Sequence, residues 1–143
     1  MADILLDLPI RAGPERLFDA VTTPAGLDQW WTLQSSGERR VGAEYRLCFG
    51  PDYDWRAKVI RCAPVTDFEF EMSAADSDWV GTRVGFRLTP RGDVTWLRFH
   101  HLGWKMPNEH YRISCHCWAM YLRVLRRYLE HGETVPYQSR LDA

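Results

Sequence analysis

Cysteine and histidine residues gather in the last third of the chain, where they could bind a metal ion. Cys115, His116 and Cys117 are consecutive, and His110 lies just upstream. This stretch is predicted to be helical, and residues two apart on a helix point about 200° away from each other. Cys115 and Cys117 therefore cannot chelate the same ion, and the chain has neither a C-x-x-C pair nor an H-E-x-x-H helix. We expect reduced thiols, no bound metal and no other cofactor.

His101 is the best polar candidate for contact with a ligand. Alternation from Thr95 onward places His101 on the inner face of a strand and His100 on the outer face. An imidazole among apolar side chains could hydrogen-bond a carbonyl or carboxylate of a ligand, or act as a general base. The alternative, which we favour, is a core histidine whose nitrogens are satisfied by a backbone carbonyl or by the Tyr45 hydroxyl.

Acid–base pairs and activated nucleophiles are not evident from the pattern. Ser114, Cys115 and His116 are neighbours on a predicted helix, where adjacent side chains diverge, and Gly81 and Gly85 fall in a strand pattern instead of a phosphate loop. The acidic residues lie in apparent loops or alternate outward along a strand: Asp52, Asp54, Asp76, Asp78, Glu69 and Glu71. We predict no catalytic residue, so an enzyme is an open but unsupported alternative.

Hydrophobic periodicity predicts the elements that must position these side chains. Residues 4–11 alternate as a strand, and a short helix begins at Pro14, whose missing N–H is tolerated in the first turn. A second short helix is expected from Pro24 to about Trp30. From Thr32 onward the pattern has a period of two and predicts several strands joined by short turns, which indicates an antiparallel sheet.

A long amphipathic helix is expected from near Asn108 to a C-cap at Gly132. Its apolar edge carries four residues at spacings of four, three and four: Trp118, Leu122, Leu125 and Leu129. Each predicted strand has one apolar face, and this helix is the element that can cover it. The fold class is therefore α+β, with one domain over residues 1–133 and a polar, loosely held tail over residues 134–143.

Composition and charge narrow the classes of partner. The chain has 143 residues, with 18 Lys and Arg against 19 Asp and Glu, for a formal net charge of −1. This balance argues against a nucleic-acid-binding protein, because no basic field would attract phosphate. We also expect no membrane span and, since the first residues do not resemble a signal peptide, a cytoplasmic protein.

Three stretches carry a resemblance to a known superfamily: residues 14–21 followed by Trp30-Trp31, residues 81–84 with 95–103, and residues 118–132. They resemble the START-like helix-grip (SRPBCC) superfamily, whose fold is shared with birch-pollen-type allergens. Within it, the chain is most similar to homologues of the activator of the heat shock protein 90 ATPase, C-terminal domain type. The resemblance implies a curved antiparallel sheet wrapped around the long helix, with a hydrophobic cavity between them. It implies no single activity, since related folds bind lipids and polyketides, assist a chaperone or catalyse cyclisation.

From the resemblance and the alternation we predict a largely aromatic ligand cavity, although a filled core would show the same pattern. The expected ligand-binding residues are Trp31, Tyr45, Phe49, Trp55, Phe68, Phe70, Met72, Phe86, Phe99, His101, Trp118 and Leu122. The predicted function is non-enzymatic binding of a small hydrophobic or amphipathic molecule, such as a lipid or an aromatic or polyketide-like metabolite. The alternatives are a chaperone-associated interaction module and a small cyclase, hydrolase or isomerase. We expect a monomer or a homodimer.

Overall fold

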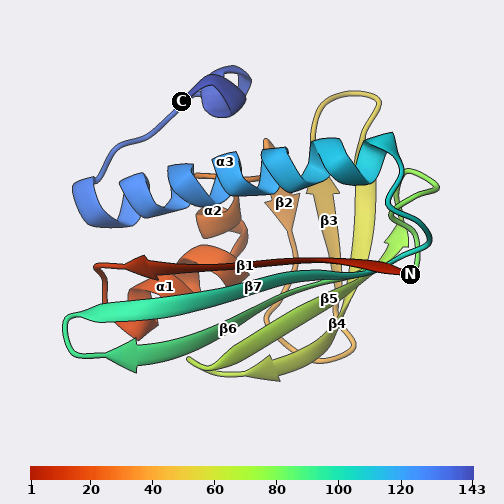
Figure 1. Ribbon diagram of the computed structural model, residues 1–143. Helices are drawn as coiled ribbons and strands as arrows, with labels where there is room; N and C mark the ends of the chain where they lie inside the picture. The colour runs from red at the N-terminus through yellow and green to blue at the C-terminus, as the bar shows by residue number, and fades with distance from the viewer.

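The computed structural model describes residues 1–143, which form one antiparallel sheet gripped by a long helix (Figure 1). In chain order the elements are β1 (Ala2–Ile10), α1 (Pro14–Thr22), α2 (Pro24–Leu27), β2 (Gln34–Ser36), β3 (Glu44–Cys48), β4 (Asp54–Ala63), β5 (Asp67–Ala74), β6 (Arg83–Arg91), β7 (Val94–Trp104), α3 (Glu109–His131) and the 3-10 helix η1 (Tyr137–Asp142). The predicted α+β helix-grip class is confirmed.

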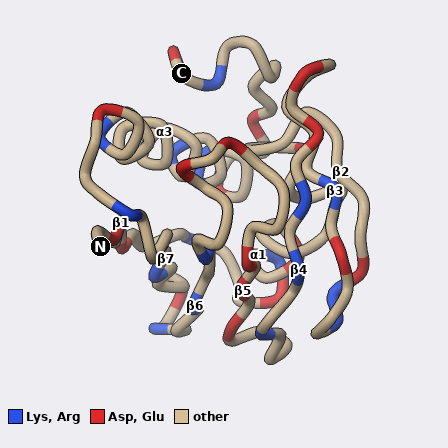
Figure 2. The backbone as a smooth tube through the Cα atoms, turned by 90° about the vertical axis from the view of Figure 1, so that its right-hand side faces the viewer, with Lys and Arg blue, Asp and Glu red and all other residues tan.

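The sheet contains seven strands in the order β1-β7-β6-β5-β4-β3-β2. Figure 2 shows that it curves around α3 instead of lying flat beneath it. Apolar side chains from successive strands face each other across the register, as in the pairs Phe86–Phe99 and Leu88–Leu97. Because such alternation gives each strand one apolar face, the sheet needs a cover on its concave side. A single cluster of 30 buried apolar residues fills the space between sheet and helices.

The long helix α3 begins next to Asn108 and ends at the C-cap Gly132, as its sequence predicts. The Asn108 side chain accepts a hydrogen bond from the backbone N–H of Tyr111 at 2.9 Å, and Gly132 ends the helix with a left-handed backbone at φ 67°. The predicted apolar edge is buried, with exposed fractions of at most 5% at Trp118, Leu122, Leu125 and Leu129. The prediction that this edge packs toward the sheet is confirmed.

The second short helix ends earlier than expected, at Leu27 instead of near Trp30. Trp30 and Trp31 are buried together, and their ring centroids are 6.1 Å apart in a stacked pair. Adjacent side chains on a continuous helix would diverge by about 100°, so the chain leaves the helix in order to bury the two rings. The Trp30 indole N–H then donates to the Ala20 carbonyl of α1 at 2.9 Å.

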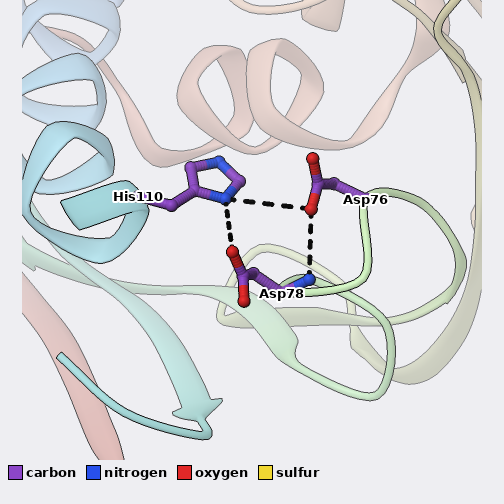
Figure 3. Close-up of side chains that lie close together, drawn as sticks. All are labelled: Asp76, Asp78 and His110. Carbon is purple, nitrogen blue, oxygen red and sulfur yellow. Dashed lines mark hydrogen bonds and ion pairs between the residues drawn. The ribbon is translucent and has the colours of Figure 1, made fainter. Parts of the chain in front are cut away.

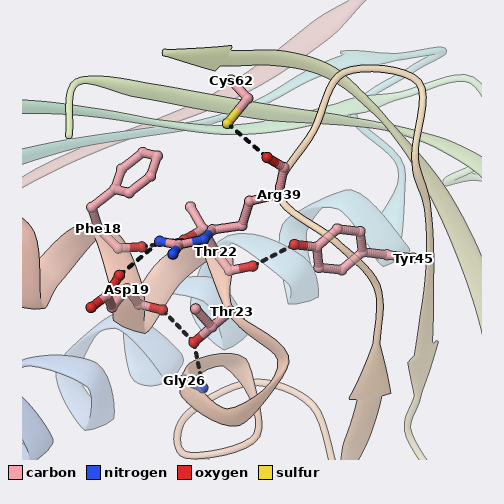
Figure 4. A network of polar contacts seen from close by, with 8 residues as sticks. All are labelled: Phe18, Asp19, Thr22, Thr23, Gly26, Arg39, Tyr45 and Cys62. Atoms are coloured by element: carbon pink, nitrogen blue, oxygen red, sulfur yellow. Dashed lines mark hydrogen bonds and ion pairs between the residues drawn. The ribbon is translucent and has the colours of Figure 1, made fainter. Parts of the chain in front are cut away.

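A polar network joins α1 to β3 and to the segment between β2 and β3 (Figure 4). Tyr45 of β3 donates its hydroxyl hydrogen to the Thr22 carbonyl at 2.6 Å, and burial raises the pKa of Tyr45 to about 12. Arg39 reaches Asp19 at 2.7 Å. This network fixes the orientation of the two short helices against the sheet.

The C-terminal tail differs from the loosely held segment expected over residues 134–143. Residues Tyr137–Asp142 form η1, and Arg140 is 5% exposed. Its guanidinium donates to the backbone carbonyls of Asp28 at 2.6 Å, Thr32 at 3.0 Å and Val135 at 3.2 Å. The tail is anchored because a planar, five-donor side chain satisfies carbonyls that the sequence pattern does not connect with it.

Two residues of the sheet region also differ from expectation. Glu69 points to the convex face as its alternation predicts, yet it is only 3% exposed, because it pairs with His100 at 2.5 Å. Gly81 lies in the turn before β6, with φ +84°, and not in a strand. None of the helices is long and apolar enough to cross a lipid bilayer.

Candidate functional site

One pocket of about 370 Å³ opens between the first half of α3, the β3–β4 turn, the β5–β6 connection and η1. Seven of its twelve lining residues are Phe, Trp or Tyr. The lining residues are Trp31, Phe49, Tyr53, Trp55, Asp76, Trp79, His110, Ile113, Ser114, Cys117, Tyr121 and Tyr137. The residues that α3 contributes recur at helical spacing, so the pocket uses a stripe of α3 separate from its buried apolar edge.

Three of the residues predicted to bind a ligand lie on the pocket wall, namely Trp31, Phe49 and Trp55. The other nine are packed into the core, each at most 2% exposed: Tyr45, Phe68, Phe70, Met72, Phe86, Phe99, His101, Trp118 and Leu122. The interior is filled because large rings interlock there, as where the Phe99 and Trp118 centroids lie 4.5 Å apart. The three wall residues reach the pocket and the nine pack against other core side chains, and a ligand role stays a prediction for all twelve.

His101 lies beneath the pocket and does not line it. Its Nδ1 accepts a hydrogen bond from the Trp118 indole at 3.1 Å, and its Nε2 lies 2.8 Å from the Thr82 hydroxyl. Thr82 donates its own hydrogen to the Trp79 carbonyl at 2.6 Å, so the Nε2–H of His101 must donate to Thr82. The core interpretation of His101 therefore fits this structure, but its partners are not the expected backbone carbonyl or the Tyr45 hydroxyl. Burial lowers the pKa of His101 to about 3.

One corner of the pocket is polar (Figure 3). His110, in the first turn of α3, places Nδ1 3.0 Å from Asp78 and 3.9 Å from Asp76. Asp76 also accepts the backbone N–H of Asp78 at 3.2 Å, and Asn108 donates to Asp78 at 3.3 Å. Asp76 and His110 line the pocket, whereas Asp78 lies behind them. A histidine oriented by a carboxylate can act as a general base, and an imidazole with two carboxylates can also bind a divalent cation.

The ligand atoms of Asp76, Asp78 and His110 all lie within 4.8 Å of one another. Sequence reasoning noted the two aspartates as loop residues and His110 as a neighbour of the cysteines, but it did not join them. His110 follows the two aspartates by more than thirty positions, and no spacing rule connects a loop with the start of a distant helix. The four cysteines are free and only partly buried.

Several wall residues were missed because they lie in loops, in the tail, or on a second stripe of α3. Trp79 is in the β5–β6 connection and is 7% exposed, while Tyr137 belongs to η1 and donates its hydroxyl to the Phe49 carbonyl at 3.1 Å. Neither position carries a periodic signal. The only indication in the sequence that such residues could line a pocket was the abundance of aromatic residues outside the predicted strands.

The wall is weakly charged apart from the polar corner. Neither Lys nor Arg lines it. Burial raises the pKa of Tyr121 to about 12 and also raises the pKa values of Tyr137 and Cys117, so these groups are neutral at physiological pH. The pocket thus combines aromatic surface, neutral hydroxyl and thiol groups, and one acidic corner.

A curved sheet around a long C-terminal helix, with an aromatic pocket at one end, defines a START-like helix-grip protein. The chain belongs to the family described as "Activator of Hsp90 ATPase homolog 1-like protein", whose model matches residues 11–130. A search of curated proteins found no match.

Solved structures support the fold. The Aha1 dimer from Colwellia psychrerythraea is 29% identical, with a TM-score of 0.84 over 93% of this chain and 99% of that chain. Protein MLL2253 from Mesorhizobium loti is 20% identical, with a TM-score of 0.78 over 92% of this chain and 99% of that one. CalU16 from Micromonospora echinospora is 20% identical, with a TM-score of 0.75 over 98% and 84%. The last two show the fold alone.

Proposed function

We propose that this protein binds a small hydrophobic or amphipathic molecule in the pocket between α3, the β3–β4 turn and η1. The observation that carries the proposal is the open pocket of about 370 Å³ whose wall is mainly aromatic. Sites for small molecules are typically concave, mostly apolar and roughly 300–1,000 Å³ in volume, with a few polar groups that orient the ligand. Asp76, His110 and Tyr121 supply such groups.

The pocket chemistry favours binding over nucleophilic catalysis. Burial raises the pKa of Cys117, which makes its thiolate scarce at neutral pH. Ser114, one turn beyond His110 on α3, is 5% exposed and is not hydrogen-bonded to a base. The His110–Asp78 pair is the group that a cyclase or hydrolase of this fold would use as a base.

The second candidate is a chaperone-associated interaction module. Membership of the activator family supports it, and the similar protein from Colwellia psychrerythraea is described as an Aha1 dimer. A homodimer of this chain is part of the same proposal.

Native mass spectrometry of freshly purified protein, followed by thermal melts with fatty acids, flavonoids and polyketide-like aromatics, tests the first candidate. A ligand that binds only the folded state raises its stability, by about 2.7 kcal/mol at a hundred times the dissociation constant. We expect the shift to disappear in Cys117→Phe, which fills the pocket.

The matched control is Ala119→Phe, which adds the same ring at an exposed position of α3. It should respond to ligand like the wild type. If no compound is retained or shifts the melt, while the protein stimulates a chaperone ATPase, the binding proposal is wrong and the second candidate replaces it.

A further inference from the structure

We infer that the pocket selects ligands with a positive charge, such as an amine or quaternary ammonium group on an apolar body. This inference rests on the proposed function, because it names the ligand class of the same pocket. It follows from two independent features of the wall, the arrangement of its aromatic rings and the sign of its charged groups.

The aromatic rings form a continuous, angled surface. Trp31 lies 5.4 Å from Phe49, Phe49 lies 5.2 Å from Trp55, and Trp55 lies 4.9 Å from Trp79, measured between ring centroids. The planes of each pair are inclined by 53° to 65°, so neighbouring rings cannot all present edges to the same point. Ring faces are electron-rich and attract cations, most strongly in tryptophan.

The charged groups in the wall favour the same class of ligand. Asp76 lines the pocket with its carboxylate about half exposed, and Asp78 lies next to it. Among the residues that line the pocket, only His110 can become cationic, and it can contribute at most one positive charge against the two carboxylates. The three side chains Asp76, Asp78 and His110 therefore carry a net negative charge whether or not His110 is protonated.

Two permanent cations, Arg140 and Lys105, contact neighbouring segments but do not line the pocket. Arg140 lies over the Tyr137 ring at 5.4 Å, but its guanidinium is already bound to three backbone carbonyls. Lys105 donates from its ammonium to the Ser77 carbonyl at 3.5 Å. A carboxylate ligand such as a fatty acid would thus find no Lys or Arg on the wall, whereas an ammonium would meet aromatic side chains and a carboxylate.

Three naphthalene compounds of nearly equal shape test this inference by isothermal titration calorimetry: 1-naphthylmethylamine, 1-naphthalenemethanol and 1-naphthoate. We expect the amine to bind about tenfold more tightly than the alcohol, and the naphthoate to bind most weakly. Asp76→Asn should weaken the amine by about threefold to tenfold and leave the alcohol unchanged.

The control is Asp93→Asn, which removes the same charge from the exposed β6–β7 turn. It should leave all three affinities unchanged, which separates a local effect of Asp76 from the effect of net charge. If the alcohol or the naphthoate binds as tightly as the amine, charge selection is wrong and the proposed function stands. If none of the three binds, and the melt with the broader panel is also flat, the proposed function fails as well.

Discussion

The indole N–H of Trp118 donates to Nδ1 of His101 across 3.1 Å, which joins the centre of α3 to β7 inside the core. The other ring nitrogen of His101 donates to the Thr82 hydroxyl, which in turn donates to the Trp79 carbonyl. Trp79 in turn forms part of the pocket wall. One buried histidine thus ties the helix, the sheet and the loop that shapes the pocket, and the bond from Trp118 requires an unprotonated Nδ1.

Acidification should destabilise the protein through His101. Its pKa falls from the ordinary value of 6.5 to about 3 in the folded state because burial disfavours the charged ring. Below pH 6.5 the unfolded state therefore binds more protons than the folded state, and stability falls as the pH drops toward about 3. The slope from this residue can reach about 1.4 kcal/mol per pH unit, measured by urea unfolding.

The ring can also be observed directly. The NMR chemical shift of the His101 Cε1–H should stay constant between about pH 8 and pH 5. In His101→Gln the pH dependence of unfolding should be shallower than in the wild type. A His101 signal that titrates near pH 6.5 would contradict the buried, neutral ring.

Truncating Leu122 to Ala should lower the free energy of unfolding by about 2–5 kcal/mol, because its side chain is 2% exposed against the sheet. The neighbouring Arg123→Ala changes an exposed position of the same helix and should stay within about 0.5 kcal/mol of the wild type. Urea melts of the two variants measure the difference. Equal stability would be inconsistent with a helix that closes the core.

Glu69 and His100 should contribute to stability although they lie on the convex face. Burial alone would raise the pKa of Glu69, but its hydrogen bond and charge interaction with His100, together with the charges of Arg61 and Arg83, hold the pKa below its ordinary value. Glu69→Ala leaves a half-buried imidazole without its partner and should cost about 3 kcal/mol. Glu71→Ala, two positions along the same strand and exposed, should cost much less in the same melts.

Gly85 should be required for the contact between Glu69 and His100. A Cβ at this position would collide with the ring of His100, which lies over the glycine from the neighbouring strand. Gly85→Ala should therefore destabilise the protein by about 1–3 kcal/mol, as overpacking does. In a His100→Ala background most of that cost should vanish, so additive losses in the double-mutant cycle would refute the contact.

Arg140→Lys should loosen the tail although it keeps the charge. Lysine has no planar fork with which to reach the carbonyls of Asp28, Thr32 and Val135, and carbonyls left unpaired cost about 1–3 kcal/mol. We expect faster protease cleavage within residues 134–143 and weaker ligand-induced shifts, since Tyr137 belongs to the pocket wall. Arg123→Lys on the exposed face of α3 is the control. If Arg140→Lys is cleaved at the same rate as the wild type and this control, the tail is not anchored by Arg140.

The sequence by itself determined the class of fold. Periods of two and 3.6 are local, so they correctly predicted the inward faces of the strands, the start of α3 near Asn108 and its end at Gly132, and the burial of Leu122. The local pattern also placed His101 on the inner face and His100 on the outer face, because successive side chains of a strand point to opposite faces in any surroundings.

Only the tertiary structure decided where the pocket lies and what forms it. Alternation is the same for a filled core and an open cavity, and packing of large rings filled the interior. The pocket uses Trp79 and Tyr137 from irregular segments, and its corner joins Asp76 to His110 across 34 positions. The anchoring of the tail by Arg140 and the burial of Glu69 on the outer face were not predicted, for the same reason. A polar side chain is buried when distant backbone or side-chain groups satisfy it, and no local pattern contains that information.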